Sequence, residues 1–306
     1  MKPNRTKQSF YKLFALFTVI RGYNVAVLIF AMYITAYFIF SKDTTLFHFF
    51  EKVELHLIVL ASAFTISGGF IINNFYDLDK DAISRPLPTY ISRFINQNFK
   101  LTVYLIFCSI ALITAFLASW RVGFFFIIYN FMVWFYSHKI SKITLIHNIF
   151  YVVLSMMPFL ALLLFYNNYS PIIFYHGIYL GLLLLSMDIV KDLTTYQGDL
   201  IYNYQTLPVT FGIYKTKWFI SFILGLSFIW TRIMTTFNEV GHMGLYFTFV
   251  SVLIILILVL IWRFKAKWQY NFIYLLLKFI LGVGVLSIAW IKINPLDLQK
   301  FFPLNN

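Results

Sequence analysis

Residues 64–86 of the chain read FTISGGFIINNFYDLDKDAISRP, an apolar run that passes directly into a group of polar and acidic residues. Asn73, Asp77 and Asp81 follow one another at intervals of four residues, so a helix would carry them on one face. Asp79 falls off that face, and we expect it to be solvated. Carboxylates beside a hydrophobic run are costly without a partner or a function. The stretch therefore predicts a functional site at the end of a membrane helix.

The composition predicts an all-α, polytopic membrane bundle. The chain has 306 residues, of which 61% are hydrophobic and only 11% are charged. A soluble domain could not cover so much apolar surface with polar residues. Several runs have the length of about 20 residues that a helix needs to cross a bilayer. We expect one integral-membrane domain over residues 1–306, with nine transmembrane helices at residues 16–40, 55–76, 100–119, 121–137, 146–166, 172–192, 217–236, 243–262 and 272–292.

Lysine and arginine set the expected orientation, because cytoplasmic loops are enriched in them. With nine spans, fifteen of these residues lie on the side of the N-terminus and six lie on the other side. We therefore expect a multi-pass protein of a bacterial inner membrane whose functional site faces the cytoplasm. We attribute the net charge of +13 to loop residues that set the membrane orientation and contact membrane lipids. We therefore exclude nucleic acid as a partner. The sequence leaves the oligomeric state open.

A second acidic group occurs in MDIVKDLTTYQGDL, residues 187–200. Asp188 and Asp192 are four residues apart, and Asp199 follows seven residues later. If the helix continues past Gly198, these three carboxylates and Thr195 form one narrow stripe. Under the expected topology both acidic groups emerge on the same side of the membrane, where they can meet. The alternative is that both are ordinary helix-end charges in loops.

Two facing stripes of carboxylates suit Mg²⁺ better than zinc or copper, because Mg²⁺ prefers hard oxygen ligands. Mg²⁺ usually completes its shell with water and substrate phosphate. Four cations lie nearby in the sequence and could meet phosphate oxygens: Arg85, Lys139, Lys142 and Lys191. The pattern therefore predicts an amphiphilic ligand with a diphosphate head and a lipid tail. His138 and His147 are expected to be helix-end histidines near the lipid headgroups.

These residues resemble the motifs of the UbiA superfamily of intramembrane prenyltransferases. The first family motif, N-D-x-x-D-x-x-x-D followed by an Asn-Arg-Pro-like segment, is matched by Asn73, Asp77, Asp81 and Ser84-Arg85-Pro86, with Asn74 as the departure. The second motif is matched by Asp188, Lys191, Asp192, Gly198 and Asp199, followed by Thr206-Leu207-Pro208. Weaker matches are Arg21 and Asn24 near the start of the first span, and Tyr136, Ser137, Lys142 and Asn148. Thr195 stands where the family normally has an aspartate, which puts the metal stoichiometry and the activity in doubt.

The resemblance implies a prenyltransferase that binds a polyprenyl diphosphate through Mg²⁺ and moves the prenyl group to a lipophilic acceptor. By resemblance, the catalytic residues are Asp77, Asp81, Asp192 and Asp199. The same four aspartates, with Asn73, are the implied metal ligands. The implied substrate-binding residues are Asn24, Asn73, Arg85, Tyr136, Lys142, Lys191, Asp188 and Thr195.

The acceptor is less well defined. The second motif resembles the digeranylgeranylglyceryl phosphate synthase-like branch, which favours a geranylgeranylglyceryl phosphate-type lipid. An aromatic acceptor of quinone or pigment biosynthesis is the alternative within the family. A transporter, or a non-catalytic binding protein that keeps the fold, is the alternative outside enzymes. Mg²⁺-dependent release of pyrophosphate would separate the enzyme from both.

Overall fold

The computed structural model describes residues 5–41 and 45–291, and within these ranges the chain is helical with short connections and no strand. The elements in chain order are α1 (Arg5–Val19), α2 (Gly22–Thr35), the π-helix η1 (Ala36–Phe40), α3 (Leu46–Phe50), α4 (Val53–Ser84), α5 (Pro86–Ser92), α6 (Gln97–Ala118), α7 (Trp120–His138), η2 (Ile140–Lys142), α8 (Ile146–Tyr166), α9 (Pro171–Ile201), α10 (Leu207–Met234), η3 (Asn238–Met243), α11 (Gly244–Arg263), α12 (Lys267–Ser287) and η4 (Ile288–Ile291). The predicted all-α membrane bundle is confirmed.

Within the described residues, eight helical segments are long and apolar enough to cross a membrane, against nine predicted spans. The difference is α7, which is 19 residues long but carries Arg121, Asn130 and His138 and is less apolar. Ser119 separates α6 from α7 and caps α7 by accepting a hydrogen bond from the Arg121 amide at 3.2 Å. Helices α6 and α7 are therefore joined by a tight turn of one residue.

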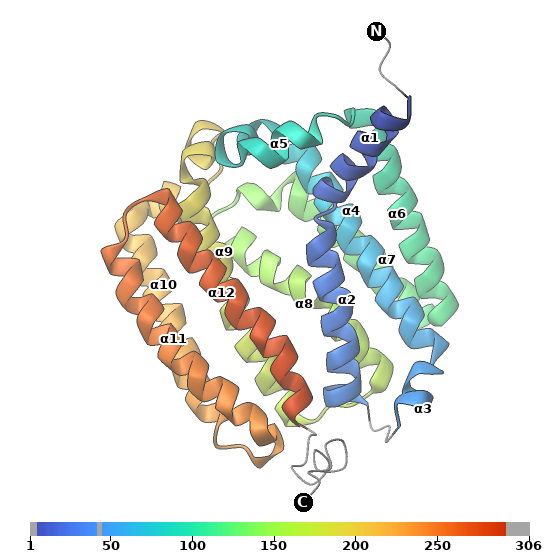
Figure 1. Ribbon diagram of the computed structural model, residues 1–306, viewed down its shortest axis with the longest axis vertical. Coiled ribbons are helices and arrows are strands. Elements are labelled where there is room, and N and C mark those ends of the chain that lie inside the picture. Colours follow the sequence, from blue (N-terminus) through green and yellow to red (C-terminus); the bar gives the residue numbers. More distant parts are fainter. Residues whose placement is uncertain (1–4, 42–44, 292–306) are drawn as a thin grey trace, which may run out of the picture.

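The first predicted span is too long at its N-terminal end. The chain breaks between α1 and α2, where Arg21 adopts a left-handed backbone conformation with φ 50° and ψ 52°. The membrane-crossing segment begins only at Gly22 and ends at Phe40. Helix α1 instead lies beside α5 at one end of the bundle (Figure 1). Hydropathy did not predict the break, because the apolar residues before and after it were taken as one run.

Helices α4 and α9 are longer than predicted and end beyond the hydrocarbon region. They have 32 and 31 residues, or roughly 45 Å each at 1.5 Å per residue, whereas the hydrocarbon core is about 30 Å thick. The added turns carry Asp77 and Asp81 on α4 and Asp199 on α9. The predicted ends at residues 76 and 192 followed the loss of apolar residues, but helical structure continues to Ser84 and Ile201.

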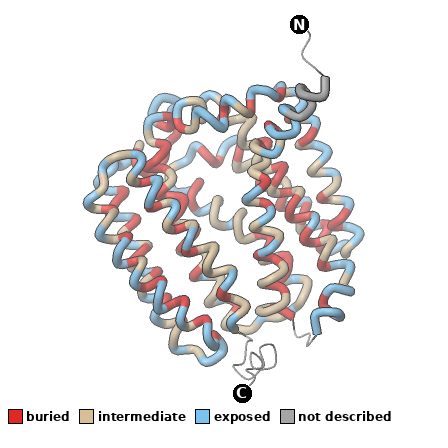
Figure 2. Tube along the Cα trace, viewed as in Figure 1, coloured by how far each residue is buried: buried red, intermediate tan, exposed pale blue. Residues whose placement is uncertain are grey.

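The helices pack as two halves (Figure 1). One buried cluster joins α9, α10, α11 and α12, with Leu224, Ile257 and Leu277 at its centre. The other joins α2, α4, α7 and α8 around residues such as Ile58 and Phe126. The outer faces of the helices are exposed (Figure 2) and carry many large apolar side chains. A lipid-facing surface requires this arrangement, since lipid tails are themselves apolar.

Candidate functional site

A cavity of about 860 Å³ lies between the two halves and runs the height of the bundle. Its lining includes Asp77 and Asp199 near the ends of α4 and α9, and Phe40 and Met243 near the opposite end of the molecule. Most of the wall between these ends is apolar. The space therefore has a charged mouth and a long apolar interior.

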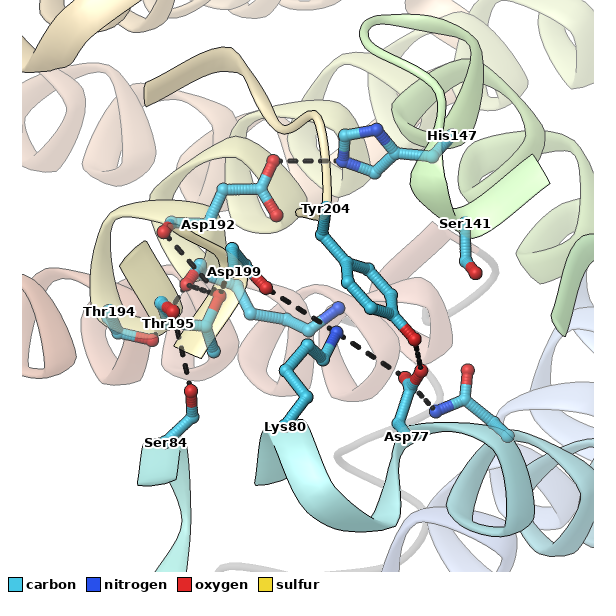
Figure 3. Close-up of polar contacts among 12 residues, drawn as sticks. Asp77, Lys80, Ser84, Ser141, His147, Asp192, Thr194, Thr195, Asp199 and Tyr204 are labelled. Carbon is cyan, nitrogen blue, oxygen red and sulfur yellow. Dashed lines mark hydrogen bonds and ion pairs between the residues drawn. The ribbon is translucent and has the colours of Figure 1, made fainter. Parts of the chain in front are cut away.

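Asp77 is the central residue of the part of α4 that lines the cavity, here called the α4 wall, and it is 6% exposed. The Asn73 amide donates to one of its oxygens at 2.9 Å, and the Tyr204 hydroxyl donates to the other at 2.7 Å (Figure 3). Lys80 approaches the same carboxylate at 3.4 Å. Burial, together with the charge of Asp77, raises the pKa of the Tyr204 hydroxyl. Tyr204 therefore stays protonated and holds the orientation of Asp77.

Asp199 is the matching residue of the α9 wall. The helix continues through Gly198 to Ile201, so Asp192, Thr195 and Asp199 share the predicted stripe and line the cavity. The Thr195 hydroxyl donates to Asp199 Oδ2 at 2.7 Å, and Lys80 Nζ lies 3.5 Å from Asp199 Oδ1. Lys80 thus bridges the two acidic groups (Figure 3).

Gly198 is the residue that lets α4 and α9 approach this closely. A Cβ atom at Gly198 would clash with Ser84 Oγ and lie 2.9 Å from the Lys80 carbonyl oxygen. The Ser84 hydroxyl also donates to the Thr195 carbonyl at 3.3 Å. The meeting of the two acidic groups therefore depends on a missing side chain at position 198.

Asp188 lies behind the residues that line the cavity. It is fully buried, and it accepts hydrogen bonds from Asn148 and Lys191, each at 3.0 Å. Asn148 also donates to Asp192 at 3.0 Å, so one amide joins two carboxylates of the stripe. Asp188 is not among the described residues that line the cavity. Its position is that of a structural partner of Lys191 and Asn148.

The prediction for His147 was wrong. His147 is buried rather than at the headgroups, and its Nε2 atom lies 3.0 Å from Asp192 Oδ2. Its Nδ1 atom contacts the Ile143 carbonyl at 3.0 Å, which fixes the ring. His147, Asp188 and Asp192 each offer an atom within 4.8 Å of the others, a spacing that could hold a metal ion. His138, in contrast, is exposed, as predicted.

The structure brings most of the other predicted site residues to the cavity. Its lining includes Asn24, Asn73, Asp81, Arg85, Tyr136 and Lys191. Lys142 is not among the described residues of the lining, but its Nζ atom lies 5.2 Å from the centre of the Tyr204 ring. Asp79 is exposed, as predicted. Sequence reasoning missed Lys80 and Tyr204; the position of Lys80 three residues after Asp77 was a usable signal, whereas nothing distinguished Tyr204.

The oxygen atoms at the cavity mouth fit a hard divalent cation. Asp199 Oδ1 is buried and accepts no hydrogen bond within the described part of the chain. The Asp81 side chain likewise has no hydrogen bond or ion pair to any residue that the structure describes. Asp77 and Asp192 add carboxylate oxygens from the two opposing walls. Such an array of carboxylate oxygens suits Mg²⁺.

Comparisons with known proteins agree with this architecture. The family model of the UbiA prenyltransferase family matches residues 30–280. A digeranylgeranylglyceryl phosphate synthase of Methanobrevibacter smithii is 26% identical over 203 residues, covering 63% of this chain and 68% of its own. The enzyme of that name from Sulfurisphaera tokodaii is 27% identical over 215 residues, covering 64% and 72%. The structure of a UbiA homologue from Archaeoglobus fulgidus bound to GPP and Mg²⁺ superposes with a TM-score of 0.70 at 16% identity, covering 91% of this chain and all of the other.

Proposed function

The chain belongs to the UbiA prenyltransferase family, and from that premise we propose that it transfers a polyprenyl group from a prenyl diphosphate to a lipophilic acceptor. One observation carries the proposal. The acidic groups of α4 and α9 meet at the mouth of a cavity that is apolar along the rest of its length. A prenyl diphosphate has the same division into a charged head and an apolar chain.

The side chains at the mouth have separable tasks. Asn73, Asp77, Asp81, Asp192 and Asp199 are the candidate ligands of Mg²⁺, which would supply positive charge to the diphosphate and make it a better leaving group. Arg85 and Lys191 line the same space and add charge to the departing pyrophosphate. The apolar wall excludes water from the allylic cation that forms when the carbon–oxygen bond breaks. The rings of Tyr136 and Tyr151 line the cavity near this point and can stabilise that cation.

Unpaired cations in the cavity support an acceptor that carries a phosphate group. Of the basic residues that fall inside the predicted spans, Arg21, Lys191 and Lys278 line the cavity. Lys191 is paired with Asp188. Arg21 and Lys278 have no carboxylate within ion-pair distance among the described residues. They lie instead over the rings of Phe70 and Tyr274, at 4.9 Å and 4.8 Å from the ring centres.

Lys278 lies within a membrane-crossing segment and Arg21 lies directly before one, where a cation normally has a counter-ion or serves a ligand. Arg21 is also held in a left-handed backbone conformation, a strain of the kind that clusters at ligand sites. We therefore propose a geranylgeranylglyceryl phosphate-type acceptor, whose phosphate would lie against Arg21 and Lys278. The names of the two archaeal relatives agree with this choice, and a neutral aromatic acceptor would offer neither cation a direct ion pair.

The proposed orientation places the site on the cytoplasmic face of a bacterial inner membrane. The short connections at the site's end of the bundle are rich in lysine and arginine, which supports the cytoplasmic side. Water-soluble pyrophosphate would then leave directly into the cytoplasm.

The test uses the purified protein in lipid nanodiscs with geranylgeranyl diphosphate, Mg²⁺ and either geranylgeranylglyceryl phosphate or 4-hydroxybenzoate. Pyrophosphate release and product mass are measured together. We expect a prenylated glyceryl phosphate, loss of product in Asp77→Asn and Asp192→Asn, and unchanged turnover in the control Lys265→Gln, which alters an exposed lysine.

The acceptor is tested by Arg21→Gln and Lys278→Gln. Each should raise the KM for the phosphate acceptor roughly 10- to 100-fold, the effect of one charged hydrogen bond, and leave the KM for the donor unchanged. Turnover with the aromatic acceptor and not with the phosphate acceptor would instead identify the protein as an aromatic-acceptor prenyltransferase of the same family. Folded protein without Mg²⁺-dependent turnover on either acceptor would favour binding or transport.

A further inference from the structure

Lys80 occupies the position between the two acidic groups where a bound cation would be expected. Its ammonium group lies 3.4 Å from Asp77 Oδ2 on its own helix and 3.5 Å from Asp199 Oδ1 on α9. The face of the Tyr204 ring lies 4.0 Å from the same nitrogen. Asp77 and Asp199 are buried and Lys80 is largely so, with 8%, 1% and 14% of their side chains exposed. Lys80 is therefore held on three sides rather than extended into solvent (Figure 3).

Thr195 explains how a single lysine can balance this cluster. One oxygen of Asp199 accepts from the Thr195 hydroxyl and the other faces Lys80. Thr195 is neutral, so of these two α9 residues only Asp199 brings a negative charge to the gap that Lys80 occupies. An aspartate at position 195 would place a second carboxylate one helical turn away from Asp199. Two buried carboxylates at that spacing would need more positive charge than one ammonium group provides.

We propose that Lys80 is a built-in cation of the diphosphate site, which takes the place of a metal ion in the gap between Asp77 and Asp199. Thr195 is the matched neutral residue, and Mg²⁺ is left to the carboxylates outside this gap, chiefly Asp81 and Asp192. The proposal deepens the proposed function, because the anion that Lys80 would meet is the diphosphate. It also explains why a chain without the usual aspartate at position 195 can keep a working site.

The proposal is tested by counting bound metal rather than by turnover. Mn²⁺ is titrated into the detergent-solubilised protein and its binding is followed by electron paramagnetic resonance. The titration is done with and without geranylgeranyl thiolodiphosphate, a donor analogue that does not release its diphosphate group. Lys80→Met removes the charge and leaves an unbranched side chain one atom shorter. We expect this variant to bind Mn²⁺ at least about tenfold more tightly, because a positive charge beside two carboxylates is lost. The control Lys265→Gln should bind as the wild type does.

The double variant Lys80→Met/Thr195→Asp should bind one Mn²⁺ ion more than the wild type, because it has an open gap and an added carboxylate. An unchanged Mn²⁺ affinity in Lys80→Met would overturn the proposal. This measurement on the single variant is sufficient even if the double variant does not fold. An equal metal count in a folded double variant would overturn the proposal as well. The titration without the analogue keeps this result separate from the proposed function, which fails if the analogue binds to none of the proteins.

Discussion

A single amide, Asn148, holds two buried carboxylates of the α9 wall in place. Its nitrogen donates to Asp188 and to Asp192, each at 3.0 Å, and the residue is completely buried. His147 and Lys191 supply the remaining contacts to the same carboxylates. Because a buried carboxylate without a donor is strongly destabilising, this amide fixes the position of Asp192 at the cavity.

Replacing Asn148 by leucine should therefore be costly. Asn148→Leu keeps the side-chain size but removes both hydrogen bonds, and we expect the free energy of unfolding to fall by roughly 2–3 kcal/mol. The control is Asn130→Leu, since the Asn130 amide donates to the Phe126 carbonyl of its own helix and to no other residue that the structure describes. Thermal unfolding in detergent measures both variants. Equal melting temperatures for the two would show that Asn148 has no special role.

At the level of single residues, the sequence predicted those site residues that are regularly spaced along one helix. Asp77, Asp192 and Asp199 were identified from spacing and motif resemblance, and they line the cavity. His147 and Tyr204 were not predicted as site residues, because their roles depend on contacts with helices distant in the sequence. Tyr204 is one of 21 tyrosines, and only tertiary packing distinguishes it.

Among the helices, local chemistry rather than hydropathy decides where α4 ends. Its last residue is Ser84, and Arg85 follows with φ −142° and ψ 67°, outside the helical region. Pro86 accounts for this end, because a proline disfavours the helical conformation of the residue before it. A span predicted from apolar residues alone stops earlier and leaves Asp77 and Asp81 outside the helix. The pairing of α4 with α9 is then set by Gly198.

Gly198→Ala should push these two helices apart. The new methyl group would meet Ser84 Oγ and the Lys80 carbonyl oxygen, and we expect a loss of about 1–3 kcal/mol in stability from overpacking. The contact between Lys80 and Asp199 should lengthen, so donor binding should weaken as well.

The matched control is Gly225→Ala in the middle of α10, where an added Cβ atom has no neighbour within 4 Å. That change should be neutral or stabilising by up to about 1 kcal/mol, because alanine is the better helix former. Unfolding curves and the Kd of the thiolodiphosphate analogue give the two readouts. A Gly198→Ala protein as stable as wild type would mean that α4 and α9 are not in tight contact at this point.

For the whole molecule, composition predicted a membrane bundle, but it could not predict the cavity. The cavity exists because the two packed halves, centred on residues such as Leu277 and Ile58, meet only along part of their facing surfaces. That property depends on the packing of many helices at once. The positions of Arg21 and Lys278 on its wall became meaningful only when this shape was known.

The orientation of the molecule in the membrane gives the last prediction. Lys139 is exposed at the end of the bundle that carries the site, and Glu239 is exposed in η3 at the opposite end. Each is changed to cysteine in a Cys108→Ala background, which removes the one native cysteine. A membrane-impermeant maleimide should label Lys139→Cys only in inside-out vesicles and Glu239→Cys only in right-side-out vesicles.

This result is expected because the lysine and arginine bias favours the cytoplasm for the site's end. It also follows from the chemistry of the donor, since a diphosphate made in the cytoplasm cannot cross the hydrocarbon core and must enter from that side. The opposite labelling pattern would place the acidic groups of α4 and α9 outside the cell. The donor would then have to be supplied from outside, and a prenyl transfer fed by cytoplasmic diphosphates would no longer be tenable.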